Sequence, residues 1–321
     1  MLRRIPSRAA LTAALVLTAA CGDAADPTAP APGGPELAAA GQRVTLPTGR
    51  GIGTKSYSIG PRTRYRAELH KGIIMAGTVR VYFILYGRWN NTDPSGMPRE
   101  GQVLTDFAAS LNGTPWLRIA TLYPDATGFP PSGYLMWARN AIDSSYSHGA
   151  TLTQADVEAI VTGKFSSGEL PLDSNGLFVV VGSPDVTVAG LGQTFCAFRG
   201  VTTAPAPHQI RTAYAFLGHP SRNPAECAPQ LSGPSGDWAS DALVFLLATE
   251  LFNTIVDPDM RSGWFDKLGL EPGDKCAWDF GPTYQASNGA LANVNLGGRD
   301  YLVPRLWVPV KNGGYCAMSP P

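Results

Sequence analysis

Gly236–Pro258, with the sequence GDWASDALVFLLATELFNTIVDP, forms a single helical pattern. Ser235 or Asp237 can cap its N-terminus, and Pro258 ends it. The segment is apolar on nearly every side as far as Leu247, which predicts that most of the helix is buried. A buried helix needs a covering layer, so we expect the rest of the chain to pack around this element.

Strand patterns elsewhere predict that layer. Thr78–Tyr86, Gly176–Val181 and Ala213–Leu217 are rich in β-branched and aromatic residues. Because strands and helices do not alternate strictly, we predict an α+β fold, with one main domain in which a mixed β-sheet packs on the buried helix. Further strands are expected at Ser132–Asn140, near Ala290–Val294 and at Tyr301–Val310, and further helices at Gln102–Asn112 and after Thr153.

The end of the buried helix carries a polar stripe. Glu250, Asn253, Thr254 and Asp257 follow one another at i, i+3, i+4 and i+7. A carboxylate inside an apolar helix is costly unless it has a partner, so Glu250 marks a polar cavity or cleft. There it could act as general base toward a metal-bound water. The structural alternative is a carboxylate held by neighbours such as Thr254.

The same helix lacks the ligands of a zinc peptidase. A helix of the HExxH type needs two nitrogen ligands one turn apart, with a Glu beside the first. Thr249 and Asn253 occupy those two positions here. Hydroxyl and amide oxygens are poor zinc ligands, so Glu250 would be a vestigial general base and zinc is not expected.

Acidic residues downstream offer a different ligand set. Together with Glu250, Asp257, Glu271 and Asp274 supply the oxygen donors that suit calcium or magnesium. In the alternative interpretation Asp257 ends the helix, while Glu271 and Asp274 lie in a solvated turn.

Candidate binding residues lie in loops. His148 precedes a predicted helix, and Trp264 and Trp278 lie beside polar loops. Aromatic rings in polar loops suit stacking against sugar rings or peptides, which suggests a cell-envelope polymer or peptide as partner. The alternatives are a histidine hydrogen-bonded within its turn and tryptophans packed in the core.

The N-terminus has the pattern of an export signal. Residues 1–20 contain three arginines followed by an apolar run at 9–20, which is shorter than the roughly 20 residues that span a bilayer. Cys21 follows the sequence LTAA, as in a bacterial lipobox, and would be lipidated. The alternative is an ordinary secretory signal that happens to contain a cysteine.

Composition divides the rest of the chain into a tether and a domain. Residues 21–58 are rich in Ala, Pro and Gly, typical of a disordered tether, and residues 59–321 would form the folded domain. We therefore expect an exported lipoprotein, anchored to a membrane by its lipid and facing the periplasm or cell surface.

The charge balance excludes one class of partner. The chain has 25 basic and 25 acidic residues; removing residues 1–20 subtracts three arginines, leaving 22 against 25 and a net charge of −3. Such a domain has no electrostatic reason to bind nucleic acid.

Four cysteines remain after Cys21, and an even number in an exported chain predicts two disulfides. Three pairings are possible. Pairs Cys196–Cys227 and Cys276–Cys316 are favoured because each closes a local loop. A cysteine metal site is the alternative, although no C-x-x-C spacing supports it.

Short blocks in a fixed order also suggest a family. The chain resembles the EXORDIUM (phosphate-induced) family of secreted proteins from about residue 72 to Cys316. The blocks are Val81-Tyr82 with Tyr86-Gly87-Arg88-Trp89, Tyr146-Ser147-His148-Gly149, Phe195-Cys196-Ala197-Phe198, Val256-Asp257-Pro258, Gly263-Trp264-Phe265, Glu271 to Trp278 (EPGDKCAW), Trp307-Val308-Pro309-Val310 and Tyr315-Cys316.

The resemblance has consequences for the buried helix. Family members often carry His-Glu-x-x-Glu there, which implies a zincin-like arrangement with the helix beneath the sheet. Thr249 replaces the His and Asn253 the second Glu, while Glu250 and Asp257 match. The resemblance therefore implies a binding or signalling module of the cell envelope with a degenerate metallopeptidase-like site. The alternative is a metal-dependent hydrolase with an altered ligand set.

Overall fold

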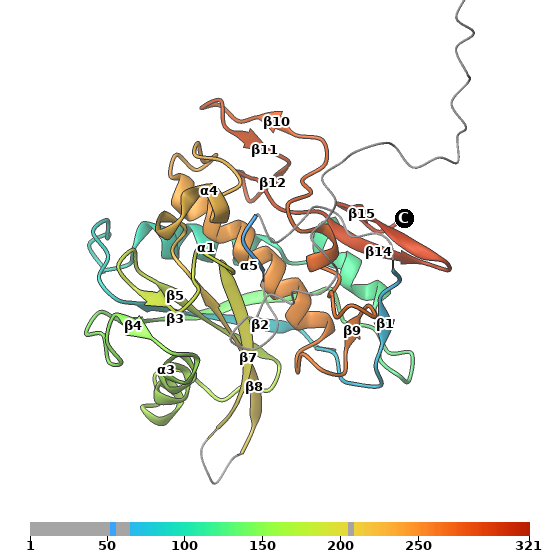
Figure 1. Cartoon of the computed structure of the whole chain (residues 1–321), viewed down its shortest axis with the longest axis horizontal. Coiled ribbons are helices and arrows are strands. Elements are labelled where there is room, and N and C mark those ends of the chain that lie inside the picture. Colours follow the sequence, from blue (N-terminus) through green and yellow to red (C-terminus); the bar gives the residue numbers. More distant parts are fainter. Residues whose placement is uncertain (1–51, 56–64, 205–208) are drawn as a thin grey trace, which may run out of the picture. The chain divides into compact units, whose positions relative to one another are not determined.

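A five-stranded sheet lies at the centre of the domain (Figure 1). The computed structural model describes residues 52–55, 65–204 and 209–321, which all belong to a compact unit formed by Val44–Pro321. The predicted signal peptide, the lipidation of Cys21 and most of the predicted tether lie outside the described residues.

The sheet is mixed, as predicted. Its strand order is β3-β2-β5-β8-β7, in which the first four strands are parallel and β7 runs antiparallel at the edge. The α+β prediction is confirmed, and the predicted strands near 78–86, 132–140, 176–181 and 213–217 correspond to β2, β3, β5 and β8. The strands are β2 (Val79–Tyr86), β3 (Leu135–Asp143), β5 (Gly176–Gly182), β7 (Ala197–Thr203) and β8 (Arg211–Leu217).

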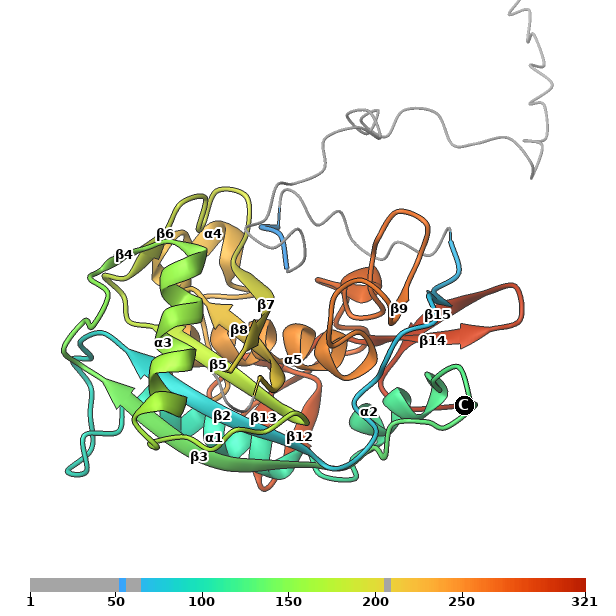
Figure 2. The same cartoon turned by 90° about the horizontal axis from the view of Figure 1, so that it is seen from below.

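Helices cover both faces of this sheet (Figure 2). Phe83 and its alternate neighbours on β2 pack in one cluster with α1 (Arg99–Ser110) and α5 (Trp238–Val256). Ile84 and its alternate neighbours pack in the other cluster with α3 (Gln154–Ser166). Both faces of the central strands are therefore apolar, as expected for parallel strands between helical layers.

Helix α5 is the predicted buried helix. Its N-cap is Asp237, whose side chain accepts a hydrogen bond from the Ala239 N–H, and the helix ends at Val256. Within the described part of the chain, α5 is the one helix long and apolar enough to cross a membrane. Its apolar window is completely buried by the surrounding protein, which is typical of a core helix.

The remaining elements are short. The predicted strand at Tyr301–Val310 is two strands, because residues 302–305 separate β13 from β14. The pairs are β1 (Glu68–Leu69) with β9 (Trp264–Phe265), β4 (Thr151–Leu152) with β6 (Thr187–Val188), β10 (Tyr284–Gln285) with β11 (Leu291–Ala292), β12 (Val294–Leu296) with β13 (Arg299–Tyr301), and β14 (Leu306–Val310) with β15 (Gly313–Ala317). The short helices are α2 (Pro115–Arg118), η1 (Ile119–Leu122), η2 (Pro220–Arg222), α4 (Pro224–Cys227) and η3 (Asp274–Cys276).

Residues 52–55 are part of the domain, so the tether prediction is wrong for them. Ile52 and Thr54 are buried. The Cys196 N–H donates to the Ile52 carbonyl at 3.0 Å, and the Thr54 N–H donates to the carbonyl of Thr194 at 3.2 Å. Backbone pairing with a distant segment, which composition does not reveal, holds this piece of chain in place.

Two disulfides close local loops. Cys196, just before β7, pairs with Cys227 in α4, and Cys276 pairs with Cys316 in β15. The favoured pairing is confirmed. The second bond attaches the loop that follows α5 to the C-terminal hairpin.

Candidate functional site

A guanidinium group lies where the sequence predicts a cation site. Arg199 is on the edge strand β7, and its side chain is only 1% exposed. Its Nε is 3.2 Å from Oε2 of Glu250, and its Nη2 donates to Oε1 of Glu271. Its Nη1 donates to the main-chain carbonyl of Asp257 at 3.1 Å and approaches the Thr254 hydroxyl at 3.4 Å. We call Arg199, Glu250, Asp257 and Glu271 the arginine cage.

Glu250 is closed off from solvent. Its side chain is 0% exposed, and its Oε1 accepts a hydrogen bond of 2.8 Å from the Ile52 N–H. Burial raises the pKa of Glu250 to about 8, against the opposing effect of the Arg199 charge. The expected contact with Thr254 is different in kind, because that hydroxyl donates to the Glu250 main-chain carbonyl at 2.6 Å.

The other two carboxyl groups of the cage are also buried. Asp257 is the C-cap of α5, and its Oδ1 accepts from the Gly263 N–H at 2.8 Å. Burial, and next the charge of Glu271, raise the pKa of Asp257 to about 8. Glu271 is 0% exposed, so its placement in a solvated turn is wrong. Burial alone would lower the pKa of Arg199, but the carboxylates of Glu271 and Glu250 raise it, so its charge is retained.

Thr249 and Asn253, the two positions at which a zinc helix would carry its ligands, make structural contacts. The Thr249 hydroxyl donates within the helix to the Phe245 carbonyl at 3.2 Å. Asn253 accepts from the Gly273 N–H at 2.7 Å and donates to Asp274 Oδ1 at 2.8 Å. A Cβ on Gly273 would lie 2.5 Å from Oδ1 of Asn253, so only glycine fits this approach. Asp274 therefore binds the helix through Asn253, outside the arginine cage.

This arrangement does not fit a divalent metal ion. Within the described ranges, no group of three or more His, Cys, Asp or Glu side chains is placed to hold one. The Arg199 guanidinium already lies between Glu250 and Glu271 and supplies the positive charge that a metal would bring. The cage is built to hold the edge strand, α5 and the loop after α5 together.

A second buried ion pair stabilises the same loop. Lys275 Nζ is 2.8 Å from Asp266 Oδ2, with both side chains at most 1% exposed, and it also lies 4.6 Å from the centre of the Trp307 ring. Almost every residue of the EPGDKCAW block therefore has a defined contact. Glu271 pairs with Arg199, Gly273 and Asp274 hydrogen-bond to Asn253, and Cys276 forms a disulfide with Cys316.

Sequence reasoning missed Arg199 and Ile52. Arg199 follows the Phe195–Phe198 block and is the lone charge in the run AFRGVTT. An arginine within such a run, in a chain whose core helix carries an unpartnered carboxylate, is the signal that was available. Ile52 contributes only its backbone, so no side-chain pattern could reveal it.

His148 lies in a separate hydrogen-bonded turn. The main-chain N–H of His148 donates to the Tyr86 hydroxyl at 2.8 Å, and the ring atom Nδ1 is 2.9 Å from the Ser147 hydroxyl. Ser147 in turn donates to Asp143 at the end of β3. The turn follows the carboxyl ends of β2 and β3, and no contact joins His148 to the arginine cage in the described residues.

The two predicted binding tryptophans are partly buried. Trp264 donates through Nε1 to the Pro124 carbonyl at 2.9 Å, and its ring meets Tyr123 edge-on. Trp278 packs against Phe245 of α5, with ring centres 4.5 Å apart. Both therefore contribute to the packing of the core.

Comparisons with known proteins point to one family. The family described as "Phosphate-induced protein 1 conserved region" matches residues 67–317. Protein EXORDIUM-like 5 from Arabidopsis thaliana is 27% identical over 274 residues, covering 75% of this chain and 74% of the relative. EXORDIUM-like 3 from the same plant is 25% identical over 288 residues, which cover 78% of this chain and 82% of the relative. EXORDIUM is 25% identical over 287 residues, which cover 75% of this chain and 86% of the relative. No solved structure matches the chain.

Proposed function

Because the chain belongs to the phosphate-induced protein 1 (EXORDIUM) family, we propose that it is a non-catalytic binding or signalling module of the cell envelope. In this proposal the domain has a zincin-like arrangement in which the metal site is degenerate. Two features support it: α5 lies beneath a mixed sheet, and the antiparallel edge strand β7 reaches that helix at Glu250.

The state of Glu250 carries the proposal. A general base needs a carboxylate oxygen that can reach a water molecule and take its proton. One oxygen of Glu250 accepts the Ile52 N–H, and the other faces the Arg199 guanidinium. With the side chain fully buried, neither oxygen is available to a substrate.

The location and the partners of the module are part of the same proposal. Disulfides persist in oxidising compartments, so the two bonds support an exported protein. We propose that lipidated Cys21 anchors it to a membrane and that it binds a cell-envelope polymer or peptide rather than nucleic acid.

A metal-dependent hydrolase with an altered ligand set is the second candidate. It is favoured by the convergence of two carboxyl groups, Glu250 and Glu271, and the main-chain carbonyl of Asp257 on one cation. An all-oxygen set would suit calcium better than zinc. Calcium would have to displace the Arg199 guanidinium from the cage.

A peptidase assay separates the two candidates. The purified exported protein and its Glu250→Gln variant are incubated with a mixed peptide library, with and without a chelator, in the presence of zinc or calcium. We expect no cleavage that differs between the two proteins or responds to the chelator. Chelator-sensitive cleavage by the natural protein that is lost in the variant would establish the hydrolase instead.

A further inference from the structure

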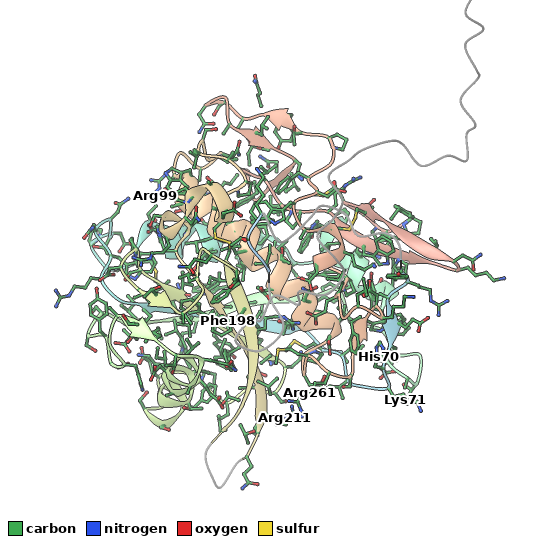
Figure 3. The ribbon with its side chains drawn as sticks, in the orientation of Figure 1. His70, Lys71, Arg99, Phe198, Arg211 and Arg261 are labelled. Atoms are coloured by element: carbon green, nitrogen blue, oxygen red, sulfur yellow. A yellow bond between two sulfur atoms is a disulfide. The ribbon has the colours of Figure 1, made fainter. Side chains whose placement is uncertain are left out.

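A surface hollow of about 410 Å³ lies beside the end of the edge strand. Its lining includes Val201 and Thr203 of β7, Arg211 of β8, and the loop residues Asp259 and Arg261. Figure 3 shows Arg211 and Arg261 together near the far ends of β7 and β8. The volume is within the range of ordinary ligand sites.

The hollow is the surface continuation of the arginine cage. Arg199, Val201 and Thr203 follow one another at alternate positions of β7, so their side chains leave the same face of the strand. Arg211 is the cross-strand partner of Thr203. Asp257, at the end of α5, leads directly into the loop that forms the opposite wall. A ligand in the hollow would therefore lie on the same face of β7 as Arg199 of the arginine cage.

Two arginines and one aspartate give the lining of the hollow a net positive charge. Arg211 and Arg261 are exposed, and neither side chain has an ion pair with any residue that the structure describes. Asp259 is the acidic residue in the lining, and hydrogen bonds engage both of its oxygens. Oδ1 accepts from the N–H groups of Arg261 and Ser262, and Oδ2 accepts from the Ser262 hydroxyl at 2.7 Å. Both guanidinium groups therefore remain available to a carboxylate on a ligand.

The edge of the sheet accepts an extended chain. Gly53 forms an antiparallel bridge with Phe195, just before β7 begins. This pairing places an extended segment against the chain that leads into β7, at the end of the strand opposite to the hollow. Among the described strands only β8 pairs with β7, so its outer side offers backbone donors and acceptors to a further strand.

We propose that this hollow binds an extended acidic peptide, which adds to the outer side of β7 and places carboxylates on Arg211 and Arg261. The proposal rests on the binding function proposed above and names its ligand class. Backbone pairing supplies general affinity, and the two arginines select acidic side chains at alternate positions of the peptide.

Fluorescence polarisation of a labelled heptapeptide with aspartate at alternate positions tests this site. The full exported protein is compared with Arg211→Gln, Arg261→Gln and the double variant. We expect affinity to fall about fivefold in each single variant and more than about tenfold in the double variant. Arg118→Gln, which removes an exposed arginine of α2 outside the hollow, should bind as the natural protein does.

Three results would overturn the proposal. The first is that a peptide with asparagine in place of aspartate binds as tightly as the acidic peptide. The second is that the double variant binds the acidic peptide as tightly as the natural protein does. The third is that the protein binds an oligouronate of equal charge but not the peptide. Arg199 and Glu250 are unchanged in all these proteins, so failure here leaves the non-catalytic account of the cage intact. Chelator-sensitive cleavage of the same peptide would instead contradict that account.

Discussion

Replacing Arg199 by methionine should strongly destabilise the domain. Methionine keeps much of the side-chain length but removes the charge and every hydrogen-bond donor. Glu271, 0% exposed, would then be buried without its cation, and Oε2 of Glu250 would lose the neighbouring guanidinium. Breaking a buried ion pair by removing one partner costs about 3–5 kcal/mol. The free energy of unfolding of a typical domain is about 5–15 kcal/mol, so this loss is a large part of the stability.

The free energy of unfolding should be measured by urea titration and the melting temperature by thermal denaturation, both without reductant, at pH 7.5 and at pH 5. We expect the melting temperature of Arg199→Met to fall by roughly 10 °C at pH 7.5. The loss should be smaller at pH 5, because carboxyl groups that have lost their cation can be neutralised by protons.

Arg80→Met is the matched control. Arg80 also lies on a strand of the central sheet and forms an ion pair with Asp173 at 3.0 Å, but its side chain is 45% exposed. Solvent screens such a pair, so we expect a loss of about 0–1 kcal/mol. If Arg199→Met costs no more than Arg80→Met at pH 7.5, the arginine cage does not hold the domain together and the reasoning is refuted.

Three further predictions concern the same region and the N-terminus. Burial raises the pKa values of Glu250 and Asp257 from 4.5 and 3.8 to about 8, so both groups hold protons in the folded protein that the unfolded chain releases. The free energy of unfolding should therefore decline as the pH rises from about 5 through about 8. A flat pH profile in urea titrations would contradict this. Gly273→Ala should cost about 1–3 kcal/mol through the clash with Asn253, whereas Gly163→Ala in α3, where a Cβ meets nothing within 4 Å, should cost nothing, and equal melting temperatures would count against the close approach. Cys21→Ser should move the protein from the membrane to the soluble exported fraction, and continued membrane association in a fractionation experiment would exclude the lipid anchor.

The core was predictable from local pattern. α5 is apolar on nearly every side, and β2 and β5 are rich in β-branched and aromatic residues, so each element is specified by its own residues. β7 was missed because an arginine and a glycine interrupt its apolar character, and only pairing with β8 makes it a strand.

The site was predictable in part. Glu250 had to have a partner, and the polar stripe pointed to the correct end of α5. Its partner is 51 positions away in the sequence, and the Ile52 N–H that it accepts is 198 positions away. Contacts of this kind depend on the register of an edge strand and on the path of a loop. No spacing within one segment encodes them.

Metal binding by the natural protein, with its Glu250→Gln variant as control, tests the central claim most directly. Each protein is incubated with excess zinc or calcium, passed through a desalting column and analysed for bound metal by mass spectrometry. Our account predicts that the natural protein retains neither metal, because the guanidinium holds the place between Glu250 and Glu271. One equivalent of zinc or calcium retained by the natural protein, and lost in its Glu250→Gln variant, would contradict it.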